Sequence, residues 1–168
     1  MIRKIFWALL GIFIVILLQS TLTNYISFFN VMPDIALCIL IYISFGNGVM
    51  TGQLTGFASG LLIDVVTLAP LGFNALMRTI IGAISGLFNG LFFMDAVLMP
   101  VLFCALATVL KGLFILLAGT FFDYSFSALA FTDSRFWIEV VYNAVLGPFV
   151  FAFLNLFKSV LVTENKKI

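Results

Sequence analysis

Runs of apolar residues, many of them about long enough to cross a lipid bilayer, follow one another along this 168-residue chain. Apolar side chains make up 64% of the sequence and charged ones only 9%, whereas about a quarter of the residues in a soluble domain are charged. Roughly 20 consecutive apolar residues suffice to span the ~30 Å of hydrocarbon in a bilayer as a helix. The sequence therefore predicts an all-α integral membrane protein with a single polytopic domain over residues 1–168.

Turn and polar signals divide the chain into six expected membrane spans. The expected spans are 5–23, 34–46, 48–68, 72–93, 96–118 and 137–157. The second span is short, so it should tilt little, thin the bilayer locally or be shielded by its neighbours. The first could be mistaken for a secretory signal, but no A-x-A site follows it and the rest of the chain is just as apolar, so we expect an uncleaved span.

The distribution of Lys and Arg predicts which side of the membrane each loop faces. Basic residues gather at both ends of the chain: Arg3, Lys4, Lys158, Lys166 and Lys167. Because such residues favour the cytoplasmic side, both termini are expected to be cytoplasmic, and loops 24–33, 69–72 and 119–136 to be outside. The last of these loops mixes aromatic and charged residues, which suits the membrane interface. It is either an aromatic belt that anchors the last two spans or a docking surface for another protein's helix.

Glycine recurs at every fourth position in the third expected span, GVMTGQLTGFASGLLID, and again in the fourth. The positions are Gly48, Gly52, Gly56 and Gly60, then Gly82, Gly86 and Gly90. Each glycine in a helix interior costs about 1 kcal/mol relative to alanine, and in lipid the offsetting gain is close approach of two backbones. The stripes should therefore pack helices inside the bundle, or else face a partner subunit or a second copy of the chain.

Three charged residues fall within expected spans: Asp64, Arg78 and Lys111. Insertion scales assign roughly 2.5–3.5 kcal/mol to such a residue at a span's centre, so each should have a partner. Asp64 and Arg78 lie at equal distances from Leu71 in the expected hairpin turn, which predicts an ion pair between them. The pair either fixes the register of the hairpin or belongs to an outward polar pocket with Asn74 and Thr67 as neighbours. Asp64 and Glu139 are both candidate partners of Lys111.

Several classes of function are excluded or disfavoured by what the sequence lacks. It contains no histidine, its net charge is +1, and its two cysteines lie in separate apolar runs. Basic residues form no footprint for nucleic acid, no metal cluster or paired-carboxylate site is visible, and no serine stands in a nucleophile elbow. We therefore expect a protein that is not an enzyme and needs no cofactor.

A pattern between residues 33 and 76 resembles that of the rod shape-determining protein MreD family. The residues that carry it are Pro33, Asp34, Gly60, Asp64, Leu71, Gly72, Ala75 and Leu76. The resemblance implies a fold similar to the S components of energy-coupling-factor transporters, with six helices and cytoplasmic termini. It also implies a subunit of the cell-wall elongation complex in the bacterial inner membrane, which supports cell shape and peptidoglycan synthesis. The partners it implies are the MreC scaffold, the MreB filament, RodA and its transpeptidase.

The sequence also allows an alternative function. A vitamin-binding S component would bind its solute in an outward pocket lined by Asp64, Asn74 and Arg78. The outer halves of the spans are mostly apolar, whereas a pocket for a polar vitamin needs several convergent polar groups, so the scaffold function is favoured. A homodimer is also possible, because the glycine stripes could face a second copy.

Overall fold

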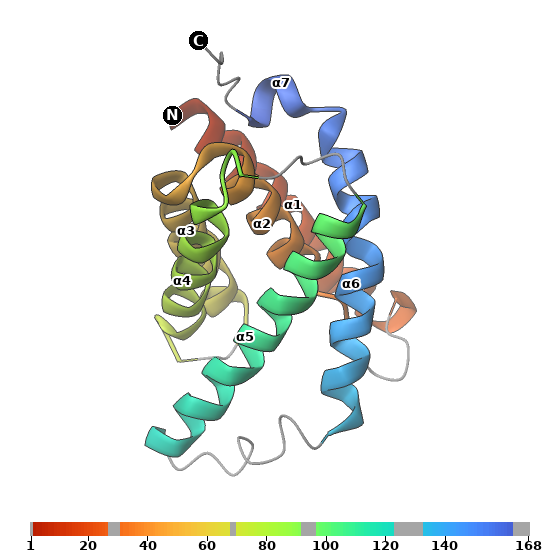
Figure 1. Cartoon of the computed structure of the whole chain (residues 1–168). Helices are drawn as coiled ribbons and strands as arrows, with labels where there is room; N and C mark the ends of the chain where they lie inside the picture. Colours follow the sequence, from red (N-terminus) through yellow and green to blue (C-terminus); the bar gives the residue numbers. More distant parts are fainter. Residues whose placement is uncertain (1, 27–30, 68–69, 92–96, 123–132, 163–168) are drawn as a thin grey trace.

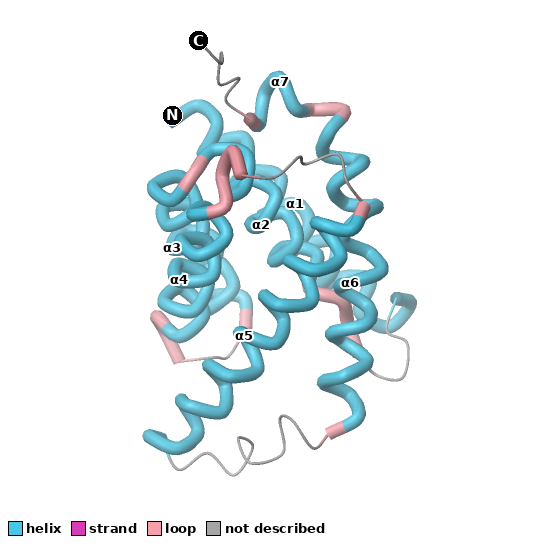
Figure 2. Tube along the Cα trace, viewed as in Figure 1, coloured by secondary structure: helices cyan, strands magenta, loops and turns pink. Residues whose placement is uncertain are grey.

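A computed structural model describes residues 2–26, 31–67, 70–91, 97–122 and 133–162. These residues fold into helices joined by short connections, and no strand runs through the described part (Figure 2). In chain order the helices are α1 (Ile2–Ile26), α2 (Ile35–Asn47), α3 (Val49–Val66), α4 (Phe73–Leu87), α5 (Leu98–Phe122), α6 (Ser134–Asn155) and α7 (Lys158–Leu161). The prediction of an all-α fold is confirmed.

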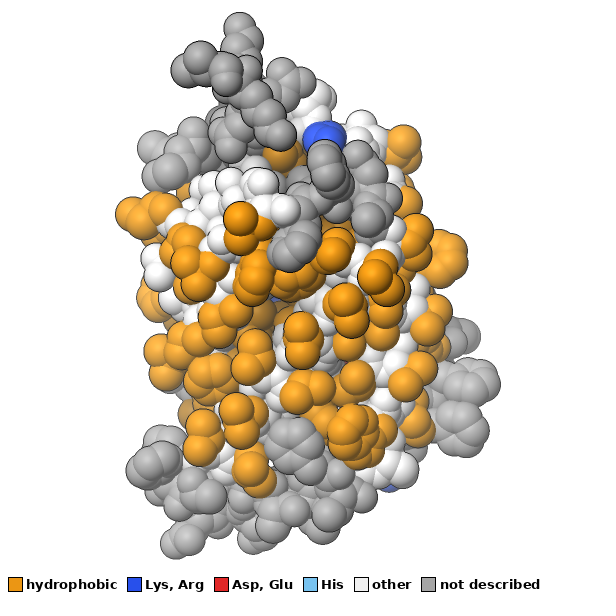
Figure 3. All heavy atoms as spheres, in the orientation of Figure 1, with side chains coloured by type: hydrophobic (Ala, Val, Ile, Leu, Met, Phe, Trp, Pro, Cys, Tyr) orange, Lys and Arg blue, Asp and Glu red, His pale blue; other side chains and the backbone are white. Residues whose placement is uncertain are grey.

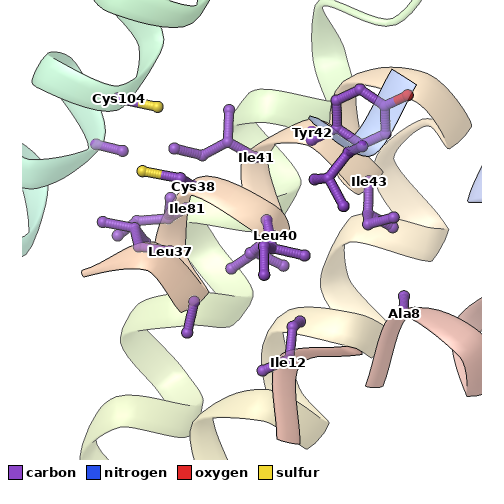
Figure 4. Packing of buried hydrophobic residues seen from close by; sticks show 14 of the residues in the cluster. Ala8, Ile12, Leu37, Cys38, Leu40, Ile41, Tyr42, Ile43, Ile81 and Cys104 are labelled. Atoms are coloured by element: carbon purple, nitrogen blue, oxygen red, sulfur yellow. The ribbon is translucent and has the colours of Figure 1, made fainter. Parts of the chain in front are cut away.

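Helix α2 forms the centre of the bundle and contacts each of the other five long helices (Figure 1). Every residue from position 36 to 46 is buried. Its side chains meet Ala8 and Ile12 of α1, Ile81 of α4 and Cys104 of α5 in one apolar cluster (Figure 4). The neighbouring helices thus surround the shortest expected span and shield it from lipid.

Helices α3 and α4 pack against each other through their glycines. A Cβ atom built on Gly52 would collide with the backbone of Gly82, and one built on Gly56 would collide with the backbone of Arg78. Gly60 is in the same situation against Ala75. Such contacts are possible only without side chains, which is the close approach that small residues permit between helices in membranes. The two stripes therefore face each other within the chain.

Several helix boundaries differ from the expected spans. Helix α4 ends at Leu87, so Gly90 lies in the following turn at φ 78° rather than on the helical stripe. Gly48 likewise precedes α3, at φ 87°. Helix α5 continues to Phe122 and α6 begins at Ser134, which shortens the expected outer segment 119–136 from both sides; its residues 123–132 lie outside the described part. The short helix α7 was not expected.

The surface of the bundle is apolar around its middle. On the face formed by α5 and α6, hydrophobic side chains cover most of the area, and basic ones show only near the two ends (Figure 3). Three described helical stretches are long and apolar enough to cross a membrane: Val49–Val66, Leu98–Leu117 and Ser134–Asn155. Three more are apolar but shorter: Ile5–Gln19, Ile35–Asn47 and Phe73–Leu87. The start of α1 and helix α7 lie at the same end of the bundle (Figure 1).

Candidate functional site

Helix α2 begins deep inside the bundle rather than at its edge. Its first turn lies beside Lys111, which is 11 residues before the end of α5, and beside Asn143, nine residues after the start of α6. At 1.5 Å per residue these offsets correspond to about 16 and 14 Å of helix. The first backbone N–H groups of a helix have no partners within the helix, and lipid offers none. The sequence must therefore supply polar groups at this depth.

Side chains from three helices bond to the backbone where α2 begins. Asp34 is the N-cap residue, and its Oδ1 accepts a hydrogen bond of 2.9 Å from the backbone N–H of Leu37. The backbone N–H of Asp34 donates to Oδ1 of Asn143 on α6, at 2.8 Å. Nε2 of Gln19 on α1 donates to the carbonyl oxygen of Pro33, at 2.6 Å. These bonds hold the start of α2 against α1 and α6.

The Asp34 carboxylate also lies at the centre of four charged side chains, which we call the charge cluster: Asp34, Arg78, Lys111 and Glu139. Nη2 of Arg78 lies 2.8 Å from both carboxylate oxygens of Asp34. Nζ of Lys111 lies 3.3 Å from Oδ2 of Asp34 and 2.6 Å from Oε1 of Glu139. Two cations thus balance two carboxylates, and the ion pairs join α2, α4, α5 and α6.

Burial differs across the charge cluster. The side chain of Arg78 is 3% exposed and that of Asp34 is 12% exposed. Lys111 and Glu139 are 21% and 19% exposed. An isolated charge is costly away from water, whereas paired charges offset one another. These four residues can therefore lie inside the bundle because together they carry no net charge.

Asp64 has a different role from the charge cluster. Its carboxylate accepts hydrogen bonds from the backbone N–H groups of Gly72 at 2.9 Å, Asn74 at 3.0 Å and Ala75 at 3.3 Å. The side-chain amide of Asn74 donates a further bond, at 2.8 Å. Asp64 therefore caps the start of α4 from the neighbouring helix, where free N–H groups and the positive end of the helix dipole favour a carboxylate.

The predicted Asp64–Arg78 ion pair is therefore wrong. Arg78 binds Asp34, and the residue across from it on α3 is Gly56 rather than Asp64. The prediction assumed a hairpin symmetric about Leu71, but α4 begins at Phe73, so the end of α3 meets the first turn of α4. The hydroxyl of the other expected pocket neighbour, Thr67, donates to the Ile63 carbonyl within its own helix segment.

Lys111 and the residues of the family pattern differ in their partners and in their burial. Of the two candidate partners for Lys111, the structure selects Glu139 and adds Asp34. Pro33 and Ala75 are buried, whereas Leu71 and Leu76 are exposed on the surface of the bundle. Gly72 adopts φ 94°, a left-handed conformation that glycine reaches without strain, and it allows the turn to place its N–H on Asp64.

Sequence reasoning missed three members of the site, and it noted Asp34 only as part of the family pattern. Gln19, Asn143 and the buried Thr108, whose hydroxyl accepts from Nδ2 of Asn143 at 2.9 Å, were not singled out. Their position was the available signal, because Gln19 and Asn143 are amide side chains within the expected spans 5–23 and 137–157. A polar residue within a span is itself an indication of a partner.

The charged side chains of the site are paired across helices. Among the described residues no group of three His, Cys, Asp or Glu side chains is arranged to hold a metal ion. The two cysteines, Cys38 and Cys104, are buried and form no disulfide. In the part of the chain that the structure describes, the carboxylates are bound to cations or to backbone N–H groups, so the arrangement joins helices.

The sequence was compared with models of protein families, with curated proteins and with solved structures. The sequence model of the rod shape-determining protein MreD family matches residues 1–157 of the 168-residue chain. Comparison with curated proteins and with solved structures gave no match. That family consists of shape-determining membrane proteins and is not known as an enzyme family, which agrees with the apolar helices and paired charges described above. The chain belongs to the rod shape-determining protein MreD family.

Proposed function

We propose that this protein is a non-enzymatic subunit of the cell-wall elongation complex in the bacterial inner membrane. The family match over residues 1–157 carries the proposal. In it, helices α1 to α6 cross the membrane as one domain with both termini in the cytoplasm. The protein binds the MreC scaffold and works beside MreB, RodA and its transpeptidase.

The internal pairing of the polar residues supports a scaffold rather than a solute carrier. A site for a polar vitamin needs several polar groups directed at the solute. Here Asp64 is engaged by α4, and Asp34 by Arg78, Lys111 and the start of α2. These bonds hold the helices in one arrangement. A protein that presents a fixed surface to a partner requires such rigidity.

We further propose that the outer surface of α6 receives the transmembrane helix of MreC. Exposed apolar residues recur there at every fourth position: Trp137, Val141, Val145, Phe149 and Phe153. Residues at this spacing form one of the ridges by which helices pack into each other's grooves. The ridge also begins where the aromatic outer segment ends, and a docking surface was one of the two roles considered for that segment from the sequence.

Site-specific photocrosslinking in cells tests both parts of the proposal. A photoreactive residue replaces Val145 on α6 or, as the matched control, Leu54 on the exposed face of α3. Tagged protein is expressed at its native level, and captured proteins are identified by mass spectrometry. We expect an MreC-like scaffold from position 145 and little from position 54.

Two results would contradict the proposal at different points. Equal capture of the scaffold from both positions would reject α6 as the docking face while keeping the complex. Recovery of an energy-coupling transmembrane subunit with its ATPases, and of no wall-synthesis protein, would instead make this chain a transporter component.

A further inference from the structure

An apolar pocket of about 400 Å³ lies between α1, the end of α6 and α7. Helices α1 and α6 both pack against α2, and the space between them is closed at the bottom by Ile39 of α2. The remaining lining side chains are also apolar: Trp7, Ala8, Leu10, Ile14, Phe153, Leu154, Phe157, Val160 and Leu161, together with Gly11. Many of them are exposed, so the pocket opens on the outer surface of the bundle.

Helix α7 covers the end of this pocket, and one hydrogen bond joins it to α2 while another joins the end of α6 to α2. Nδ2 of Asn47 donates to the carbonyl oxygen of Leu161, at 2.8 Å. The hydroxyl of Tyr42 donates to Oδ1 of Asn155, at 3.0 Å, where α6 ends. The pocket thus has a fixed end and follows α1 from Trp7 to Ile14, about 10 Å of helix, toward the middle of the bundle.

A basic side chain lies at the end of the pocket. Lys158 is exposed on α7, next to the lining residue Phe157. Arg3 and Lys4 belong to the first turn of α1, one turn before Trp7. In the sequence, Lys166 and Lys167 come after α7.

We propose that this pocket binds one acyl chain of an anionic phospholipid, with the lipid phosphate next to Lys158. An all-apolar pocket that ends beside the exposed cation Lys158 matches a molecule with an apolar tail and a negative head. A surrounding bilayer offers the tail no hydrophobic gain, since lipid is as apolar as the pocket. The selectivity therefore comes from the headgroup charge, to which each nearby Lys or Arg contributes about fivefold in affinity.

The pocket shares only Phe153 with the docking face on α6 proposed above for MreC, because its other walls are α1, α7 and the last residues of α6. It gives the α7 end of the protein a function of its own, which is to hold a negatively charged lipid at one place on the bundle. A retained lipid would join α1 to α6, two helices that otherwise meet mainly through α2.

Native mass spectrometry of the full-length protein tests the proposal. Protein is reconstituted in equal amounts of phosphatidylglycerol and phosphatidylcholine, released from the membrane mimic, and analysed for retained lipid. In the variant Gly11→Leu the new side chain enters the pocket, where a Cβ on Gly11 meets nothing within 4 Å, so folding should be unaffected. Ala152→Leu, on the exposed surface of α6 and outside the pocket lining, is the matched control.

We expect the wild type and Ala152→Leu to retain phosphatidylglycerol in preference to phosphatidylcholine, and Gly11→Leu to lose the retained lipid. Lys158→Gln should lower the preference for phosphatidylglycerol about fivefold, and Lys158→Arg should keep it. Equal retention by the wild type and Gly11→Leu would overturn the pocket as the site. A wild type that retains both lipids equally would overturn the role of the charge.

Discussion

Removing the charges of Arg78 and Asp34 together should destabilise the protein much less than the sum of the two separate removals. In Arg78→Gln, two carboxylates share the single cation Lys111, and in Asp34→Asn the nearly buried guanidinium of Arg78 loses its carboxylate. Breaking a buried ion pair from one side costs about 3–5 kcal/mol. The double variant keeps the 2.6 Å pair of Lys111 and Glu139 and has no net charge in the cluster.

The expected shifts follow from these free energies. A change of 1 kcal/mol moves the Tm of a protein of this size by about 2–4 °C, so each single variant should lose about 6–20 °C. Coupling between contacting residues reaches about 3 kcal/mol, and the double variant should therefore be more stable than the sum of the single effects by several degrees.

Thermal unfolding of the purified variants in one detergent measures the effect, with tryptophan fluorescence as the signal. Arg135→Gln, an exposed basic residue at the start of α6, is the control and should change the free energy of unfolding by less than about 0.5 kcal/mol. A second cycle with Asp64→Asn and Arg78→Gln should be nearly additive, because these side chains share no hydrogen-bond partner. A loss below about 1 kcal/mol in Arg78→Gln, or additive effects for Asp34 and Arg78, would refute the reasoning.

Three further predictions use the same unfolding measurement. Gly56→Leu should cost at least about 3 kcal/mol because the side chain meets the backbone of α4, whereas Gly11→Leu, which meets open space, should cost little; equal effects would reject the close contact of α3 and α4. Asp64→Asn should cost about 1–2 kcal/mol, since a neutral amide caps α4 less well, and an unchanged Tm would argue against the cap. Glu139→Gln should cost less than Arg78→Gln, because Lys111 keeps Asp34 and is partly exposed; a larger cost would contradict the cluster's geometry.

The membrane class, the helical fold and the glycine contact could be predicted because each depends on local composition or spacing. Gly52 and Gly56 mark a helix face without side chains, and that face must lie against another helix whichever one it is. The need of Arg78 for a carboxylate could be predicted in the same way, from the cost of a charge in lipid.

The identity of the partners could not be predicted from spacing. The partner of Arg78 depends on where α4 begins and on how deep α2 starts, and both are set by packing between distant segments. Asp34 and Arg78 lie 44 residues apart, and Asp34 and Asn143 lie 109 apart, so a hairpin argument about neighbouring spans cannot find them. The only local indication of the contact between Asp34 and Asn143 was that Asn143 is a polar residue in an apolar run.

The early start of α2 inside the bundle has a consequence for biosynthesis. The residues that satisfy Asp34 come from α4, α5 and α6, the last of them 109 positions later in the chain. At about 5–20 residues per second, the ribosome needs roughly 5–20 s to produce that last partner after Asp34 has been made. During this interval the short helix and its carboxylate must wait beside the insertion machinery or at the lipid interface. The centre of the molecule therefore reaches its final place only when almost the whole chain has been synthesised.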